Sequence, residues 1–181
     1  MAISKDNLNT PKSHYASQIF LRILAIATTL SAACLMITNK QATLIFGIQV
    51  VARYSYSPAF KFYAFANIAA FALSVLSLIA VFLMERKPLN STFYFCLFLH
   101  DLFFQQTVTV LLMAGLGAAM AIAYVGKFGN SHSGWMQICD HFGKFCNRVI
   151  ASSVVGFLGL FVYLILTIVS ANQSRKIPPS I

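Results

Sequence analysis

Residues 60–88 read FKFYAFANIAAFALSVLSLIAVFLMERKP, a long apolar run with an abrupt polar end. Between Phe60 and Met84 the only charged residue is Lys61, and the block Glu85-Arg86-Lys87-Pro88 then stops the run. A spanning helix needs about 20 mostly apolar residues, because the hydrocarbon core is about 30 Å thick and each residue rises about 1.5 Å. This stretch therefore predicts a transmembrane helix.

Three further apolar runs surround it, at Ser17–Thr38, Phe93–Tyr124 and Arg148–Ala171. The run at Phe93–Tyr124 is too long for one span, since it would reach roughly 48 Å as a helix. We therefore expect residues before His100 to lie in the headgroups or outside the bilayer. The predicted fold is all-α: an integral membrane, four-helix transmembrane bundle with helices at about 17–38, 60–84, 99–124 and 148–171.

The connecting segments complete this organisation. Residues 1–16 form a polar N-terminal tail, residues 172–181 form a short basic tail, and loops cover 39–59 and 125–147. Within the first loop, Leu44–Val51 is rich in β-forming residues, which favours a short hairpin or strand there.

Composition points the same way and excludes several function classes. Hydrophobic residues make up 59% of the chain and charged residues 9%, whereas soluble domains are about 25% charged. The net charge is +9, and most of the Lys and Arg residues lie outside the apolar runs, which indicates headgroup contacts and not nucleic-acid binding. The chain has no nucleotide-binding loop, no HExxH, no GxSxG and no CxxC. We therefore expect a protein that is not an enzyme and carries no cofactor.

The orientation in the membrane follows from the cysteines. Lys and Arg are equally frequent at the two ends of the predicted bundle, so the positive-inside rule does not decide. Cys139 and Cys146 share one small loop, which suits a disulfide in an oxidising space outside the cell. A metal site that includes His132 and His141 is the alternative, but the spacing matches no standard zinc pattern. With a disulfide in that loop, both termini are expected in the cytoplasm.

Two charged residues fall inside or beside the predicted spans. Arg22 lies in the first helix and Asp101 at the start of the third, and parallel helices place them at similar depth. A charge in a span is costly unless it is paired or reaches the headgroups, so a bridge between the two would lock these helices together. Gln105, one turn deeper than Asp101, could share the contact. Alternatively, Arg22 snorkels by itself and Asp101 is hydrated.

Small residues recur at positions where helices can approach closely. Three pairs have the small-xxx-small spacing: Gly115 with Ala119, Gly117 with Ala121, and Ser152 with Gly156. Packing within the bundle explains most of them, and an exposed seam for oligomers is the alternative. Asn67, Ser74 and Ser77 share one face of the second helix. They could form hydrogen bonds between helices or line a polar path.

Motifs along most of the chain resemble the Casparian strip membrane protein-like family of plants, which is related to the MARVEL four-span proteins. The matching segments are Leu21-Arg22-Ile23-Leu24, Met36–Gln41, Tyr56–Phe60, His100-Asp101-Leu102, Ala123–Gly126, Gly129–His132 with Trp135, and the stretch from Ile138-Cys139 to Lys144-Phe145-Cys146. Residues 39–59 lack the acidic–aromatic signature of the strip-forming members, so the resemblance is to a "-like" member. Gln105 falls where the family's acid is expected, one turn from Asp101.

The resemblance implies a plasma-membrane protein that forms homo- and hetero-oligomers with related four-span proteins. In the strip-forming members this assembly recruits cell-wall-modifying enzymes, and no member is expected to be an enzyme. The leading hypothesis is therefore a scaffold that organises a membrane or cell-wall domain, with itself, its relatives and the lipid bilayer as partners. The alternative is a small transporter or channel that uses the intramembrane polar residues.

Overall fold

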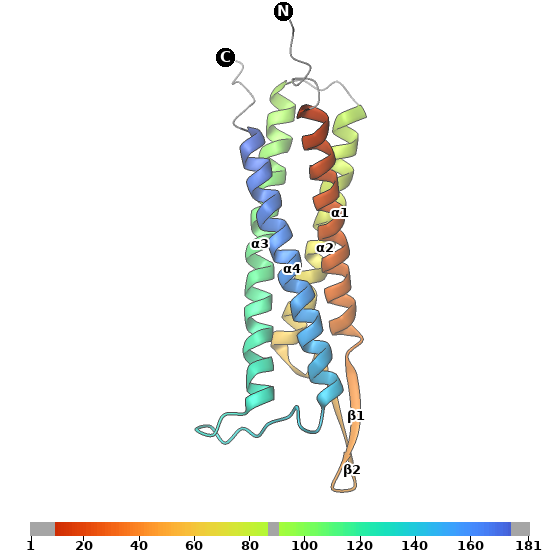
Figure 1. Ribbon diagram of the computed structural model, residues 1–181, viewed down its shortest axis with the longest axis vertical. Coiled ribbons are helices and arrows are strands. Elements are labelled where there is room, and N and C mark those ends of the chain that lie inside the picture. Colours follow the sequence, from red (N-terminus) through yellow and green to blue (C-terminus); the bar gives the residue numbers. More distant parts are fainter. Residues whose placement is uncertain (1–9, 87–90, 175–181) are drawn as a thin grey trace, which may run out of the picture.

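The computed structural model describes residues 10–86 and 91–174, which form four long helices and one β-hairpin. The helices are α1 (Thr10–Ile37), α2 (Pro58–Arg86), α3 (Ser91–Phe128) and α4 (Gly143–Ser174). They run side by side as an antiparallel bundle, with the start of α1 and the end of α4 at the same end (Figure 1). Each contains a segment long and apolar enough to cross a membrane, which confirms the predicted four-span bundle.

The helices extend beyond the predicted spans. α1 begins at Thr10 and not near residue 17, and α4 begins at Gly143 and not near residue 148. α3 takes up the whole third run from Ser91, although only Asp101–Phe128 is apolar enough to span. Backbone hydrogen bonds continue a helix through the headgroups as well as through lipid, whereas hydropathy detects only the part inside the hydrocarbon. The polar block that ends the second run extends into residues 87–90, which lie outside the described residues, as do 1–9 and 175–181.

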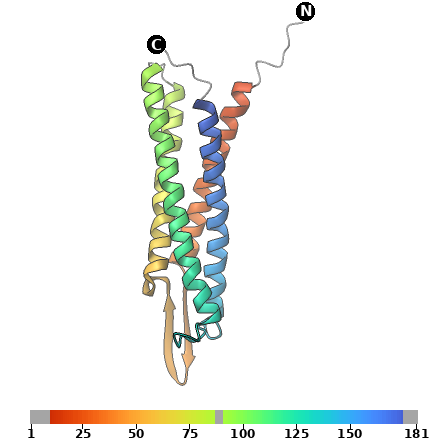
Figure 2. The same ribbon diagram turned by 90° about the vertical axis from the view of Figure 1, so that its left-hand side faces the viewer.

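A β-hairpin follows α1 and projects from the end of the bundle away from the termini (Figure 1, Figure 2). Its strands are β1 (Lys40–Ile45) and β2 (Ile48–Arg53), and they pair antiparallel from Lys40↔Arg53 to Ile45↔Ile48. Phe46 and Gly47 make the two-residue turn with φ of +51° and +80°. Positive φ at both positions is the geometry of a type I′ turn, which matches the twist of the strands. A short 3₁₀ helix, η2 (Tyr54–Tyr56), leads on to α2.

The helices pack in a ring, α1 against α2, α2 against α3, α3 against α4 and α4 against α1. Consequently α1 and α3 lie across one diagonal of the bundle. Alanines and two tyrosines, Tyr63 and Tyr163, are prominent in the interior, whereas Phe20, Phe65 and Phe161 point outward and are mostly exposed. Outward phenylalanines and inward small residues suit a lipid environment, where close packing and polar contacts hold helices together.

Candidate functional site

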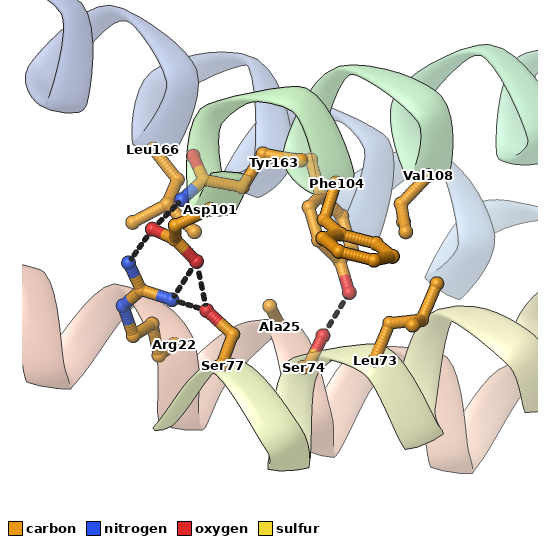
Figure 3. A pocket seen from close by; sticks show the side chains of 11 residues that line it. Arg22, Ala25, Leu73, Ser74, Ser77, Asp101, Phe104, Val108, Tyr163 and Leu166 are labelled. Carbon is orange, nitrogen blue, oxygen red and sulfur yellow. Dashed lines mark hydrogen bonds and ion pairs between the residues drawn. The ribbon is translucent and has the colours of Figure 1, made fainter. Parts of the chain in front are cut away.

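A cluster of polar side chains inside the bundle joins three helices near the end that holds the termini. Arg22 of α1 faces Asp101 of α3 across the diagonal, with Nη2 2.5 Å from Oδ2 and Nη1 3.2 Å from Oδ1 (Figure 3). The Arg22 side chain is 4% exposed and the Asp101 side chain 21%. This bidentate geometry is the strongest form of arginine–carboxylate contact, because two guanidinium nitrogens each donate to a different carboxylate oxygen.

Two further residues complete the cluster. Ser77 of α2 lies between the charges, where its Oγ accepts from Arg22 Nη1 and donates to Asp101 Oδ1. Gln105 Nε2 donates to Asp101 Oδ2 at 2.7 Å from one turn along α3. The carboxylate therefore receives donors from α1, α2 and α3. The structure thus brings together Arg22, Asp101 and Gln105, the three residues singled out from the sequence.

Space beside this cluster is very small. The cavity that these side chains line has a volume of about 20 Å³, which is close to the minimum that holds one water molecule. Arg22 Nε and Gln105 Oε1 are buried there without a hydrogen-bond partner in the described part of the chain. The cavity is thus a packing gap of water size and not a passage along the bundle.

A second contact ties α2 to α4 at the edge of the same cavity. Ser74 Oγ and the Tyr163 hydroxyl are hydrogen-bonded to each other (Figure 3). Tyr163 also donates to the Ala70 carbonyl at 3.1 Å. Ser74 and Ser77 belong to the polar face noted on the second helix. Asn67, on the same face, donates to the Tyr63 carbonyl within α2 at 2.9 Å. Ser74 and Ser77 thus form the expected hydrogen bonds between helices, whereas the Asn67 bond stays within α2.

The middle of the bundle is organised around Tyr63 of α2. Its hydroxyl donates to the Ser152 carbonyl at 2.7 Å, and Ser152 Oγ donates to the Ala32 carbonyl of α1 at 2.7 Å. A Cβ built on Gly156 would collide with the Tyr63 hydroxyl, and one on Gly115 would lie 3.3 Å from Tyr63 Cα. Gly115 of α3 and Gly156 of α4 therefore leave the space that Tyr63 occupies. These small residues serve packing inside the chain.

The two small pairs of α3 point in different directions. Gly115 and Ala119 are buried against neighbouring helices, whereas Gly117 and Ala121 are exposed on the outside of the bundle. A Cβ built on Gly117 would meet no atom within 4 Å. Only the second pair is available to another molecule.

At the hairpin end, the Cys139–Cys146 disulfide is formed, with its Cα atoms 5.7 Å apart, as predicted. The alternative, a metal site that uses both cysteine thiols, is incompatible with this disulfide, because the two sulfur atoms are bonded to each other. The loop is also clamped to the base of the hairpin, since Asn39 Nδ2 donates to the Phe145 carbonyl at 2.9 Å and the Phe145 N–H donates to Gln41 Oε1 at 2.7 Å.

Sequence reasoning missed several of these roles. Asn39 and Gln41 stood out only as parts of a motif, and nothing local indicated that they would hold the backbone of α4. Tyr63 and Tyr163 were not singled out from the sequence. The signal that could have identified them is a hydroxyl within a span, where it needs a hydrogen-bond partner.

Comparisons with known proteins agree with this architecture. Residues 11–162 match the Casparian strip membrane protein domain. CASP-like protein 1F1 of Populus trichocarpa is 50% identical over 169 residues, which is 93% of this chain and 91% of that protein. CASP-like protein 1F1 of Vitis vinifera is 47% identical (94% and 81% covered), and CASP-like protein 1F1 of Arabidopsis thaliana is 34% identical (92% and 94% covered).

No solved structure gives a significant match to this chain. The family assignment therefore rests on the domain match and on relatives that cover nearly the whole chain. With four membrane-spanning helices, the motifs quoted above and these relatives, the chain belongs to the CASP-like family of Casparian strip membrane proteins.

Proposed function

We propose that this protein is a non-enzymatic scaffold of the plasma membrane, which associates with copies of itself and with related four-span proteins. The observation that carries the proposal is the outward pair Gly117 and Ala121 on α3, set among exposed apolar side chains such as Val110, Met113 and Tyr124. Small residues on a lipid-facing helix surface let a second helix approach closely enough for van der Waals packing to drive association.

The interior supports a structural role more than transport. Arg22, Asp101 and Ser77 are engaged with one another, and the cavity beside them holds about 20 Å³. Further along the bundle the interior is filled by large side chains such as Tyr63 and Met36, both fully buried. A transporter or channel would have to break these contacts to open a path. Purified protein in vesicles should therefore leave ion and small-solute flux at the level of protein-free vesicles.

For orientation, we place the hairpin end outside the cell and both termini in the cytoplasm. The Cys139–Cys146 disulfide supports this placement, because disulfides persist in oxidising compartments. The projecting hairpin and the disulfide loop would then face the cell wall, where wall-modifying enzymes are the partners that the family resemblance implies. Fluorescent-protein complementation at either terminus should report the cytosol. Asn172-Gln173-Ser174 matches the N-glycosylation sequon, and a glycan on Asn172 would contradict the assignment, because acceptors must face the lumen during synthesis.

The test of association replaces Gly117 and Ala121 together by leucine. The extra side chains should hold a second helix away, so single-molecule photobleaching in lipid nanodiscs should shift from oligomers to monomers. Ala72→Leu, on an exposed face of α2, is the matched control and should keep the wild-type distribution. Unchanged thermal stability would show that the bundle is intact. Oligomers of wild-type size in the double variant would refute the α3 seam.

A further inference from the structure

A second cavity, larger and of a different character, lies at the hairpin end of the bundle. It has a volume of about 160 Å³ and lies between the start of α2, the end of α3 and the start of α4, with the disulfide loop as one wall. Phe60, Ile122, Val149 and Ile138 are among the residues that line it. An apolar protein cavity of about 150 Å³ stays dry and accepts a benzene-sized ligand. This one is large enough for a short length of hydrocarbon.

The cavity wall is almost entirely apolar, and the residues that line it lie at different depths along the membrane normal. Its deeper part is flanked by Ile122 of α3 and Ile150 of α4, which are 38% and 39% exposed on the outside of the bundle. Lys127 and Trp135 line it at the other extreme, at and beyond the end of the α3 span. From Ile122 to Lys127 the helix rises about 7.5 Å, roughly half the hydrocarbon depth of one leaflet. A lipid molecule has the same order, with its tail deep and its headgroup shallow.

The charge at the hairpin end favours an anionic lipid headgroup. Together, the segments 38–61 and 125–148 carry six Lys and Arg residues but a single carboxylate, Asp140. Of the six, Lys127 lines the cavity itself, and its ammonium lies 5.5 Å from the centre of the Phe128 ring. An exposed ammonium in the headgroup region is positioned to meet a phosphate.

We propose that this cavity binds one acyl chain of a phospholipid from the leaflet at the hairpin end, with the lipid phosphate against Lys127. A cavity of about 160 Å³ is too small to enclose the four fused rings of a sterol, whereas a flexible acyl chain can insert a short segment, and the flanks at Ile122 and Ile150 lie at the depth of lipid tails. The bound lipid would act as a fixed part of the hairpin end of the bundle, next to the disulfide. The inference does not depend on oligomerisation or on which side of the membrane the termini lie.

Gly126 offers a sharp test, because it lines the cavity from within α3. A Cβ there would meet only Cys139 Sγ, at an ordinary 3.9 Å, so a side chain is tolerated at the backbone. Gly126→Leu would place its isopropyl group in the space assigned to the acyl chain. Gly126→Ala adds the same Cβ and a similar gain in helix propensity but leaves most of the volume open.

The assay uses the full chain in phosphatidylcholine nanodiscs that contain a phosphatidylcholine with a photoreactive diazirine on one acyl chain. Wild-type protein should give adducts that map to residues 122–127 and 145–150. Gly126→Leu should lower these adducts about tenfold, since several buried methylenes lose their site, whereas Gly126→Ala should stay within about twofold of wild type. Melting of Gly126→Leu at or above the wild-type temperature would show that lost labelling is not lost folding. If that variant does not fold, Val125→Phe fills the same space from the neighbouring position.

The headgroup is tested with a diacylglycerol probe that carries the same photoreactive chain but lacks the phosphate. Wild type should prefer the phospholipid probe, and Lys127→Gln should abolish this preference, while Lys144→Gln, outside the cavity lining, should keep it. The proposal is overturned if wild type gives no adducts at the two segments, or if Gly126→Leu labels as wild type does. It is also overturned if a sterol probe labels the site in preference, or if crosslinks there lead to a second copy of the chain.

Discussion

Replacing Asp101 by leucine removes the carboxylate that accepts hydrogen bonds from Arg22, Ser77 and Gln105. The Arg22 side chain, 4% exposed, would keep Ser77 as its hydrogen-bond acceptor within the cluster. Four hydrogen bonds to the carboxylate are lost, two of them from Arg22, and the Arg22 charge is left buried without its ionic partner. The free energy of unfolding should therefore fall by about 4 kcal/mol.

Arg22→Leu should be milder, for reasons that the geometry supplies. Asp101 would keep Ser77 and Gln105 as hydrogen-bond donors, and its side chain is 21% exposed, so water can reach the carboxylate. The Arg22 guanidinium in Asp101→Leu is less accessible to water, because its side chain is 4% exposed. We expect a loss of about 2 kcal/mol for Arg22→Leu, and the double variant should be more stable than Asp101→Leu alone.

The assay is thermal unfolding of detergent-purified protein, followed by fluorescence-detected size exclusion, with surface expression in plant cells as a second readout. The stability order should be wild type, then Arg22→Leu and the double variant, with Asp101→Leu last. Additive losses in the double variant would refute the bridge and leave two independent snorkelling or hydrated groups. Greater damage from Gln105→Leu than from Asp101→Leu would place the main polar contact of Arg22 one turn deeper.

Three other substitutions, one of them with a matched control, test the remaining contacts. Gly156→Ala should cost about 1–3 kcal/mol because its Cβ runs into Tyr63, whereas the control Gly117→Ala should cost nothing in the same unfolding assay. Cys146→Ser opens an eight-residue loop and should lower stability by about 2.5 kcal/mol, and adding reductant should then have no further effect on the variant's melting. Phe46 has the left-handed φ of the hairpin turn, which is unfavourable for phenylalanine and acceptable for asparagine, and its side chain is 100% exposed. Phe46→Asn should therefore stabilise the hairpin and slow its amide hydrogen exchange by about fivefold. Faster exchange would show that the Phe46 side chain makes a stabilising contact.

The number of spans could be predicted from the sequence, because hydropathy over 20 residues reflects the thickness of the bilayer and needs no partner. The charge pair could be proposed for a related reason. Arg22 and Asp101 are so costly in a span that a partner had to be sought, and parallel helices place them at the same depth. Likewise, two cysteines in one small loop limit the choice of disulfide. In each case one strong local constraint restricts the number of structures that the sequence can adopt.

The direction in which a residue faces could not be predicted in the same way. Gly115 and Gly117 have equivalent surroundings in the sequence, and yet one packs on Tyr63 and the other faces outward. Apolar residues surround the whole of α3, so no hydrophobic stripe reports which side is buried. The contacts of Asn39 with Phe145 join residues 106 positions apart, and only the assembled bundle brings them together. The predicted helix ends were wrong for a simpler reason: backbone hydrogen bonds continue each helix beyond the apolar segment that hydropathy detects.

The three polar contact sites lie at different depths, and this arrangement explains how the bundle can hold one shape in lipid. Arg22 and Asp101 cross the diagonal near the termini, Tyr63 and Ser152 join α2 to α4 in the middle, and Asn39 fixes the hairpin to α4 at the far end. Lipid tails contact apolar side chains about as favourably as a neighbouring helix does, so apolar contact alone does not fix the helix register. The polar contacts and the close packing around them must therefore set it. The outward surface contributes little to that register. Side chains there can therefore change which molecules the protein binds without changing its fold, which is the property that a membrane scaffold requires.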